Sequence, residues 1–482
     1  RHKSDEATQV LLAALPLTLQ PEIKTAAVIG LGTGMTSRTA LSSSRLEKVD
    51  TVEIEEGIVR GARYFQPVVT PVFNDARSEI HVEDARTFFA NRGARYDLII
   101  SEPSNPWVSG VSSLFTREYY DLIRRYLRPG GILVQWMHVY ENDISLIMSV
   151  LKALKTRFPV FDIYQLNKSD IGIVAVAGAR LPSPYSGGFN EDMAPLLDRV
   201  RIHNADDLES LYLGSSSLLD PLIDSYPIPE NSDFFPILDL NAPRARFQQR
   251  SAAALFRLAS DPMPVVEMLS GRGTPRDALN VSAGMDGARA QAVHRALALA
   301  GYMDGSDPVD AERAVPADLE TAARSLKNPH TDCRGAGAVA RWFENARKLS
   351  MNVVPFLPPA RLARWWQALD SHACAENLGD TRQGWLDLLA ALGRRDAPLT
   401  GNLAAALLSR DSANLSLSDR SYLVKAVLMA RLARDDAAGA VADWNRFGGP
   451  VAASLESDLV LRLLVTNAVN RVEASAGGET GS

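Results

Sequence analysis

Cysteine is scarce in this sequence, and its scarcity limits the chemistry that can stabilise the fold. Cys333 and Cys374 are the only cysteines among 482 residues. Two isolated thiols predict neither a disulfide framework nor a zinc site. We therefore expect a reducing compartment and no bound metal.

A large charge excess and long apolar runs are also lacking. The net charge is −6, so the surplus of Lys and Arg that drives nonspecific nucleic-acid binding is missing. No stretch reaches the roughly 20 apolar residues of a membrane span, and no signal peptide is visible. These absences predict a cytoplasmic protein with no nucleic-acid partner, and they leave room for a small cationic substrate.

The length predicts more than one domain, because single cores stop growing well below 482 residues. From residue 25 the apolar patterns alternate between strand and helix, which is typical of a doubly wound α/β fold with a mostly parallel sheet. An Ala- and Leu-rich helical pattern follows, in which a tetratricopeptide-type repeat is one open interpretation. We expect a helical segment over 1–24, the α/β domain over 25–180, a wrapping segment over 181–250, an all-helical domain over 251–473 and a disordered tail over 474–482.

The strands of the α/β domain are expected at 25–30, 49–54, 78–82, 96–101 and 132–137, with a closing antiparallel hairpin from 160–166 and 171–177 at the sheet edge. The first strand runs into Gly30, Gly32 and Gly34, at alternate positions. Such a loop lets backbone approach a ligand closely, and the next helix points its N-terminus at the same place. Glu53 ends the second strand, where a carboxylate can accept hydrogen bonds from ribose hydroxyls. The alternative is a strand–turn–helix corner that binds nothing.

The details of this loop favour S-adenosylmethionine over a dinucleotide. A dinucleotide fingerprint has its third glycine at the position of Met35, whereas this loop has it at Gly34. Asp84, followed by Ala85, comes just after the third strand and is expected beside an adenine amino group. Asp84 can also serve as the N-cap of the next helix.

The fourth strand ends in a rigid turn that carries a carboxylate. Glu102 follows the strand directly, and prolines fix the segment around Asn105. A carboxylate at this edge can hold an ammonium group and take its proton before a nucleophilic attack. Glu102 can instead be a cap or a solvated charge. Trp107 is either part of a substrate lid or an ordinary packing residue.

These motifs together resemble the catalytic domain of the spermidine synthase family, the aminopropyltransferases. The likeness covers residues 25–140 and is carried by the following stretches: 28–34 (VIGLGTG), 52–54 (VEI), 83–86 (EDAR), 96–100 (YDLII), 105–106 (NP), 114–120 (LFTREYY) and 127–131 (LRPGG). Bacterial spermidine-synthase-like proteins that read Glu-Pro-Ser-Asn-Pro-Trp are the nearest group. The resemblance implies a class I S-adenosylmethionine-type fold, with the nucleoside held by Gly30, Gly32, Thr33, Gly34, Glu53, Asp84 and Ala85. It also implies that a membrane region often precedes the domain.

The sequence departs from this family at several acids. Thr33 stands where the family has Asp in the glycine loop, and Glu102 and Asn105 stand where it has two Asp. The family's His-Glu pair in the preceding helix falls at Gln9 and Val10. A polyamine needs several carboxylates, so polyamine specificity does not carry over. Loss of the loop acid also admits S-adenosylmethionine with its carboxylate, since a nearby anion would repel that group.

The leading hypothesis is a transferase that moves an aminopropyl or related group from S-adenosylmethionine or its decarboxylated form to a small amine. Glu102 and Asn105 are its expected catalytic residues. Trp107, Tyr140 and Glu141 are expected to line the substrate side, and His138 is either a base or structural. The rivals are a methyltransferase on the same site and a non-catalytic nucleoside sensor or scaffold. A homodimer and a membrane region N-terminal to this chain, which would make it the soluble part of an anchored protein, stay open.

Overall fold

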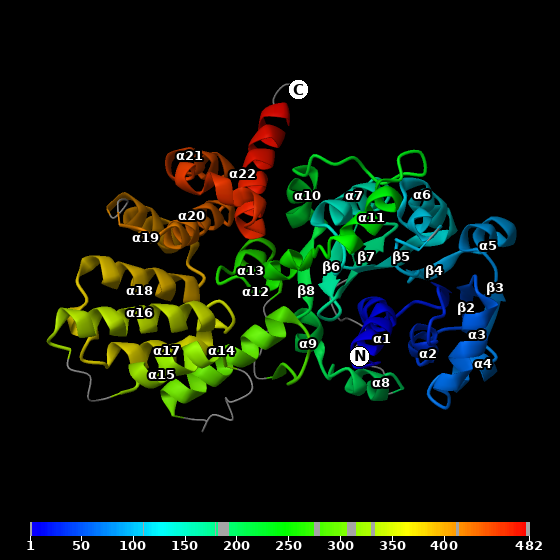
Figure 1. Ribbon diagram of the computed structural model, residues 1–482, viewed down its shortest axis with the longest axis horizontal. Helices are drawn as coiled ribbons and strands as arrows, with labels where there is room; N and C mark the ends of the chain where they lie inside the picture. The colour runs from blue at the N-terminus through cyan, green and yellow to red at the C-terminus, as the bar shows by residue number, and fades with distance from the viewer. Residues whose placement is uncertain are drawn as a thin grey trace. The chain divides into compact units, whose positions relative to one another are not determined.

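The computed structural model of the chain describes residues 2–108, 110–178, 180–181, 192–273, 280–305, 315–328, 333–410 and 414–478. The chain divides into two compact units (Figure 1). Unit 1 comprises residues 1–256 and 284–287, and unit 2 comprises residues 257–283 and 288–482. The finer domain boundaries expected from the sequence stay predictions.

Unit 1 is built on one eight-stranded sheet with the order β3-β2-β1-β4-β5-β7-β6-β8. The strands β1 to β5 run parallel, whereas β7, β6 and β8 are antiparallel to their neighbours. This mostly parallel sheet, followed by a helical unit, confirms the predicted fold class. The strands are β1 Thr25–Ile29, β2 Lys48–Glu53, β3 Ser78–Val82, β4 Tyr96–Ser101, β5 Leu127–His138, β6 Phe161–Gln165, β7 Asp170–Val176 and β8 Tyr212–Ser215.

Helices cover both faces of this sheet, which is why its central strands read as continuous apolar runs. Figure 1 shows α6, α7 and α11 on one side and α1 and α2 on the other, and α1 packs on α2, β4, β5 and β7. The helices are α1 His2–Leu19, α2 Met35–Leu41, α3 Glu56–Ala62, α4 Thr70–Asn74, α5 Ala85–Arg92, α6 Arg117–Tyr126, α7 Ile144–Lys155, α8 Ala194–Arg199, α9 Ala205–Glu209, α10 Ser216–Asp224 and α11 Ile237–Phe247. Short 3₁₀ helices are η1 Arg63–Phe65, η2 Val111–Phe115 and η3 Ala253–Phe256.

The antiparallel hairpin of β6 and β7 lies inside the sheet, so the prediction that it closes the edge was wrong. β7 pairs with β5, and β8 pairs with the outer side of β6. β8 comes from the segment that the sequence predicts to wrap around the domain with short helices. Its four residues, Tyr212–Ser215, are too few to give a pattern of alternation.

Unit 2 is all-helical in the part of it that the structure describes. The helix α20 forms much of its core, and its N-cap is Ser416, whose side chain accepts a hydrogen bond from the Asp419 backbone. The helices are α12 Arg257–Ser260, α13 Val265–Ser270, α14 Ala288–Asp304, α15 Ala317–Leu326, α16 Ala336–Val353, α17 Pro359–Asp370, α18 Asp380–Gly393, α19 Ala397–Arg410, α20 Leu417–Leu432, α21 Ala437–Phe447 and α22 Leu459–Gly478, with 3₁₀ turns η6 Ala375–Asn377 and η7 Gly449–Glu456. α22 therefore enters the tail expected to be disordered from 474, and residues 479–482 lie outside the described residues.

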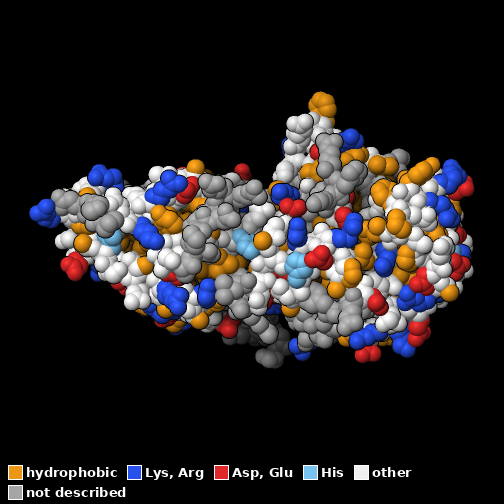
Figure 2. Space-filling model, turned by 90° about the horizontal axis from the view of Figure 1, so that it is seen from below, with side chains coloured by type: hydrophobic (Ala, Val, Ile, Leu, Met, Phe, Trp, Pro, Cys, Tyr) orange, Lys and Arg blue, Asp and Glu red, His pale blue; other side chains and the backbone are white. Residues whose placement is uncertain are grey.

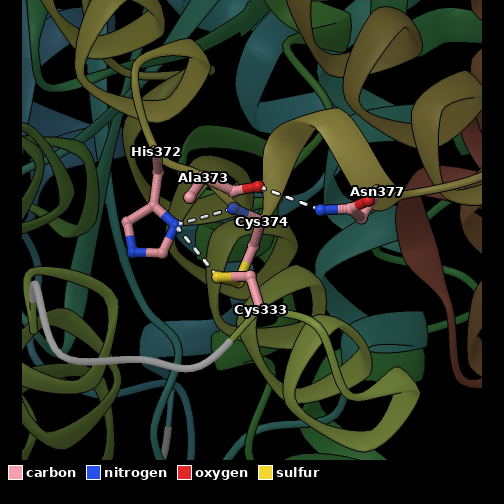
Figure 3. The surroundings of a disulfide bond; sticks show 5 residues. All are labelled: Cys333, His372, Ala373, Cys374 and Asn377. Carbon is pink, nitrogen blue, oxygen red and sulfur yellow. Dashed lines mark hydrogen bonds between the residues drawn. A yellow bond between two sulfur atoms is a disulfide. The ribbon is translucent and has the colours of Figure 1, made fainter.

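A disulfide joins Cys333 and Cys374 in unit 2 (Figure 3). The prediction of two isolated thiols was therefore wrong, and the expectation of a reducing compartment loses its support. The two residues are 41 apart in the sequence, and packing of the segment before α16 against the turn after α17 brings them together. His372 lies beside the bond, with Nδ1 4.0 Å from Cys333 Sγ, and its ring stacks on Trp342.

The surface carries no broad region of one charge on the face drawn in Figure 2, where acidic and basic side chains are interspersed over unit 1 at the right. This mixture agrees with the small net charge of −6. Among the described helices, none combines the length and apolarity that crossing a membrane requires.

Candidate active site

The candidate site lies where the carboxyl ends of β1 and β4 meet, at the point where the strand order reverses. Gly30 follows β1 with a φ of +93°. A β-carbon on this residue would lie 2.2 Å from the carbonyl oxygen of Glu102, so only glycine permits the approach. The glycine loop and the segment after β4 are therefore in direct contact, as a binding site at this edge requires.

Gly32 and Gly34 continue the loop with φ values of +51° and +88°. A β-carbon on Gly32 would lie 2.9 Å from Nε2 of Gln9, which shows that α1 covers the loop. Thr33, between these glycines, donates a hydrogen bond from its hydroxyl to Oε1 of Gln9. The position that the resemblance associates with an acid is thus occupied by a neutral hydroxyl–amide pair.

Glu53 ends β2 and is buried against the glycine loop. Its Oε2 accepts a hydrogen bond of 2.9 Å from the backbone N–H of Leu31, and its Oε1 accepts one of 3.0 Å from Glu55. A carboxylate offers about four acceptor positions, so two remain for other donors. Ile54, the next residue, is 64% exposed although it is apolar. A ligand at this sheet edge would therefore meet a hydrogen-bond acceptor on Glu53 and an apolar side chain on Ile54.

Asp84 and Ala85 follow β3 at the same edge. Asp84 Oδ1 accepts hydrogen bonds from the backbone N–H and the hydroxyl of Thr87, at 2.9 and 3.1 Å. Asp84 is therefore the N-cap of α5, as one of the two sequence interpretations had it. Ala85 is buried in the first turn of that helix. The expected contact between Asp84 and an adenine stays a prediction.

Glu102 directly follows β4, at the expected substrate position. It is half-buried, and its Oε2 accepts a hydrogen bond of 2.5 Å from the Thr36 hydroxyl at the start of α2. Burial raises the pKa of Glu102 to about 7, against hydrogen bonds from Thr36 and Gln9 that lower it, and the charge of Asp170 raises it further. The group therefore changes its protonation state near neutral pH, which suits a general base.

Asn105 and Trp107 of the loop after β4 lie beside Tyr140, which follows β5. The Tyr140 hydroxyl donates to Asn105 Oδ1 at 3.5 Å. The Trp107 ring stands edge-on to the His138 ring with centroids 4.8 Å apart, and the Tyr140 ring is 4.9 Å from the same imidazole. The loop after β4 and the end of β5 thus form one aromatic surface.

Glu141 belongs to this region through an ion pair with Arg246 of α11, at 3.3 Å. The guanidinium of Arg246 also lies 4.9 Å from the centre of the Trp107 ring. Glu141 therefore positions the cation that covers Trp107. The segment shortly after Trp107 forms the short helix η2, Val111–Phe115, and residue 109 lies outside the described residues.

His138 is fully buried, and neither ring nitrogen has a hydrogen-bond partner among the described residues. Burial lowers the pKa of His138 to about 3, so the imidazole is neutral at physiological pH. Such a weak base is a poor acceptor for the proton of an ammonium group. The structure therefore supports a packing role for His138 over the base hypothesis.

Two residues of this site were not predicted from the sequence. Thr8 comes from α1, next to Gln9, and Asp170 begins β7. Asp170 Oδ2 accepts hydrogen bonds of 2.5 Å from the Thr8 hydroxyl and 2.8 Å from Asn167 Nδ2. The sequence signal nearest to Asp170 is the turn-prone run 167–170. It predicts a hairpin turn, but it does not reveal which strands of the sheet the hairpin pairs with.

Two clusters with metal-ligand atoms occur among the described residues, one in unit 2 and one on β2 and β3 of unit 1. In one, Cys333 and Cys374 are joined by the disulfide. In the other, the Lys48 ammonium lies 3.2 Å from Asp50 and 3.3 Å from Glu79, where it supplies the positive charge. Neither cluster includes a residue of the candidate site.

Part of the chain is similar to a known protein family. The matched family is described as "Spermine/spermidine synthase domain". Residues 6–167 match the model of this family. The match contains the glycine loop, Glu53, Asp84, Glu102 and the aromatic wall, but it ends before Asp170. It covers only part of unit 1 and none of unit 2.

The relatives of this synthase-like domain include polyamine aminopropyltransferases. That of Clostridium beijerinckii is 32% identical over 157 residues, which are 32% of this chain and 55% of the relative. That of Clostridium acetobutylicum is 35% identical over 162 residues, which are 33% of this chain and 56% of the relative. The chain therefore spans about half the length of the curated relatives it matches.

Solved structures with a similar fold include two spermidine synthases. A spermidine synthase in complex with the transition-state analogue AdoDATO is 21% identical with a TM-score of 0.36, over 39% of this chain and 70% of that one. The spermidine synthase from Thermotoga maritima is 20% identical with a TM-score of 0.33, over 49% and 75% of the two chains.

Proposed function

We propose that this chain is a transferase that moves an aminopropyl or related group from the sulfonium of a decarboxylated S-adenosylmethionine-type nucleoside to a small amine. The observation that carries the proposal is the position of Glu102. It is a half-buried carboxyl with a pKa raised to about 7, in backbone contact with a glycine loop inside the spermine/spermidine synthase match.

The nucleoside of the donor would bind along the ends of β1, β2 and β3. Glu53 keeps free acceptor positions for the ribose hydroxyls while it holds the loop through Leu31. The exposed side chain of Ile54 would pack on the adenine, and Asp84 and Ala85 would meet the edge of the base. An apolar side chain that is 64% exposed in the free protein is well explained by such a partner, since its burial is favourable.

The reaction needs an amine that has lost its proton. The acceptor arrives as an ammonium, which the Glu102 carboxylate holds and deprotonates. The amine nitrogen then attacks the carbon bound to the sulfonium. A C–N bond forms as the C–S bond breaks, and the electron pair of that bond stays on sulfur to give neutral methylthioadenosine. Asn105, held by Tyr140, would orient the acceptor.

One observation favours a second candidate, methyl transfer from intact S-adenosylmethionine. Thr33, which is hydrogen-bonded to Gln9, presents a neutral group at the position where the resemblance has an acid. This group does not repel the carboxylate of S-adenosylmethionine as an acid would. The donor's tail would then be an amino acid, and the transferred group a methyl group.

The experiment that separates these functions is a product analysis. Purified protein is incubated with S-adenosylmethionine or its decarboxylated form and a panel of amines that includes putrescine, and products are identified by mass spectrometry. Methylthioadenosine together with an alkylated amine supports the proposal, whereas S-adenosylhomocysteine supports methyl transfer. Nucleoside binding without either product would favour a sensor. The E102Q variant, which keeps the shape of the side chain, is the matched control and should form no product.

A further inference from the structure

Asp170 is placed at the candidate site by the direction of its strand. β7 runs antiparallel to β5, and Asp170 lies opposite His138, the last residue of β5. The start of β7 therefore shares an edge with the carboxyl ends of β1, β4 and β5. Asp170 is buried, and it lies three residues beyond the end of the matched domain at 167. Neither the sheet nor the matched domain accounts for a carboxyl group at this position.

Two consecutive residues of α1 connect Asp170 with Glu102. The Thr8 hydroxyl donates to Asp170 at 2.5 Å. The next side chain, Gln9, accepts a hydrogen bond from Thr33 in the glycine loop, and it also acts on Glu102, whose pKa it lowers. One turn of α1 thus links the carboxyl after β4 with the carboxyl that begins β7, and the end of β5 lies between them.

The candidate site has one carboxylate fewer in the loop after β4 than the resemblance expects. The resemblance expects two acids in the loop after β4, and this chain has one, because Asn105 occupies the second position. A cationic acceptor needs compensating negative charge when it leaves water. Asp170 is the other carboxyl that interacts electrostatically with Glu102, so it is in a position to supply the missing charge.

We propose that Asp170 is the second carboxyl of the acceptor site, and that it replaces from β7 the charge missing at Asn105. The inference rests on the proposed transferase function. Asp170 holds the acceptor as an ammonium while Glu102 takes the proton of the attacking nitrogen. The substrate class that follows is an amine with a positive charge in its bound state, and neutral acceptors are disfavoured.

A purely structural role for Asp170 is the competing explanation, because Thr8 and Asn167 already bond to it. The D170N variant separates the two roles, since it keeps the size of the side chain and removes only its charge. D162N is the matched control. Asp162 is a buried acid in the same hairpin, but it pairs with Val174, toward the other end of β7.

The first measurement is amine binding to the protein saturated with methylthioadenosine. D170N should bind putrescine at least tenfold more weakly at about pH 7.5, as expected for the loss of a buried charge partner, with an unchanged Kd for methylthioadenosine. D162N should match the wild type in both. Equal putrescine affinity in D170N and D162N would overturn the assignment.

The second measurement does not depend on activity or on an acceptor. Glu102 is titrated by carboxyl-carbon NMR in protein labelled at glutamate, and E102Q identifies its resonance. The pKa of Glu102 should fall in D170N and stay the same in D162N. If the wild type forms no product with any amine, the proposed function fails, and this titration still decides whether the two carboxyls are paired. An unchanged Glu102 titration in D170N would show that they are not.

Discussion

Gly30 and Glu102 approach each other so closely that a β-carbon on residue 30 would lie 2.2 Å from the Glu102 carbonyl oxygen. This contact joins the loop after β1 to the loop after β4. The Glu102 backbone N–H also donates to the Ile29 carbonyl at 2.9 Å. The position of the proposed base therefore depends on the absence of a side chain one strand away.

A G30A substitution should destabilise unit 1 by several kcal/mol, because the new methyl group meets backbone at a positive φ. G93A is the matched control, since Gly93 has a φ of +62° and a β-carbon added to it would have no neighbour within 4 Å. It should cost only about 1 kcal/mol. Urea unfolding of both variants checks this, and a G30A cost no larger than that of G93A would contradict it.

Glu102 should make the stability of unit 1 depend on pH. Its folded pKa of about 7 lies above the ordinary value of 4.5. Protonation of Glu102 therefore favours the folded state. Its contribution to the free energy of unfolding is fully present below pH 4.5, and it is lost as the pH rises toward 7. The loss is at most about 3 kcal/mol, at roughly 1.36 kcal/mol for each pKa unit. Denaturant unfolding between about pH 4 and 8 should show this slope in the wild type and a flatter profile in E102Q.

The same titration should appear in the rate of group transfer. Because the carboxylate form accepts the proton, kcat/KM should rise with pH through about 7 on the acid side of the profile. The measurement uses saturating donor and a fixed acceptor in a series of buffers of equal ionic strength. A profile that is flat from about pH 5.5 to 8 would argue against Glu102 as the base.

E53Q should weaken nucleoside binding by roughly 10- to 100-fold, as expected when hydrogen bonds to a charged acceptor are replaced by neutral ones. Glutamine retains an oxygen for the Leu31 N–H, so the loop should keep its shape. Calorimetric titration with methylthioadenosine measures the effect. E55Q, at an exposed position two residues away, is the control, and equal affinities in the two variants would remove Glu53 from the site.

Reduction of the Cys333–Cys374 disulfide should destabilise unit 2 and leave unit 1 unaffected. The disulfide closes a loop of 41 residues. By restricting the unfolded chain, it should raise the free energy of unfolding by up to about 4 kcal/mol. Hydrogen exchange with and without a dithiol reductant should show faster exchange in α16 and α17. The C333S/C374S double variant should behave like the reduced protein, and methylthioadenosine binding should not change in either.

The sequence predicts the fold of unit 1 well because its parallel strands are buried on both faces and stand out as apolar runs between helices. The glycine loop and Glu53 are predicted with them, since their spacing is local. The contact between Asp170 and Thr8 could not be predicted, because they are 162 residues apart and periodicity indicates only local structure. The pairing of Cys333 with Cys374 could not be predicted either, because they are 41 residues apart and no local pattern indicates that they meet.

The helix α1 belongs to the chemistry of unit 1, although it precedes the first strand. It supplies Thr8 to Asp170 and Gln9 to Thr33. A shortened chain that began at Thr25 would keep every strand of the sheet and the whole glycine loop. It would nevertheless lose both side chains that connect the loop to the acids. The smallest portion suitable for recombinant dissection, or for testing the proposed activity in another scaffold, therefore starts ahead of α1.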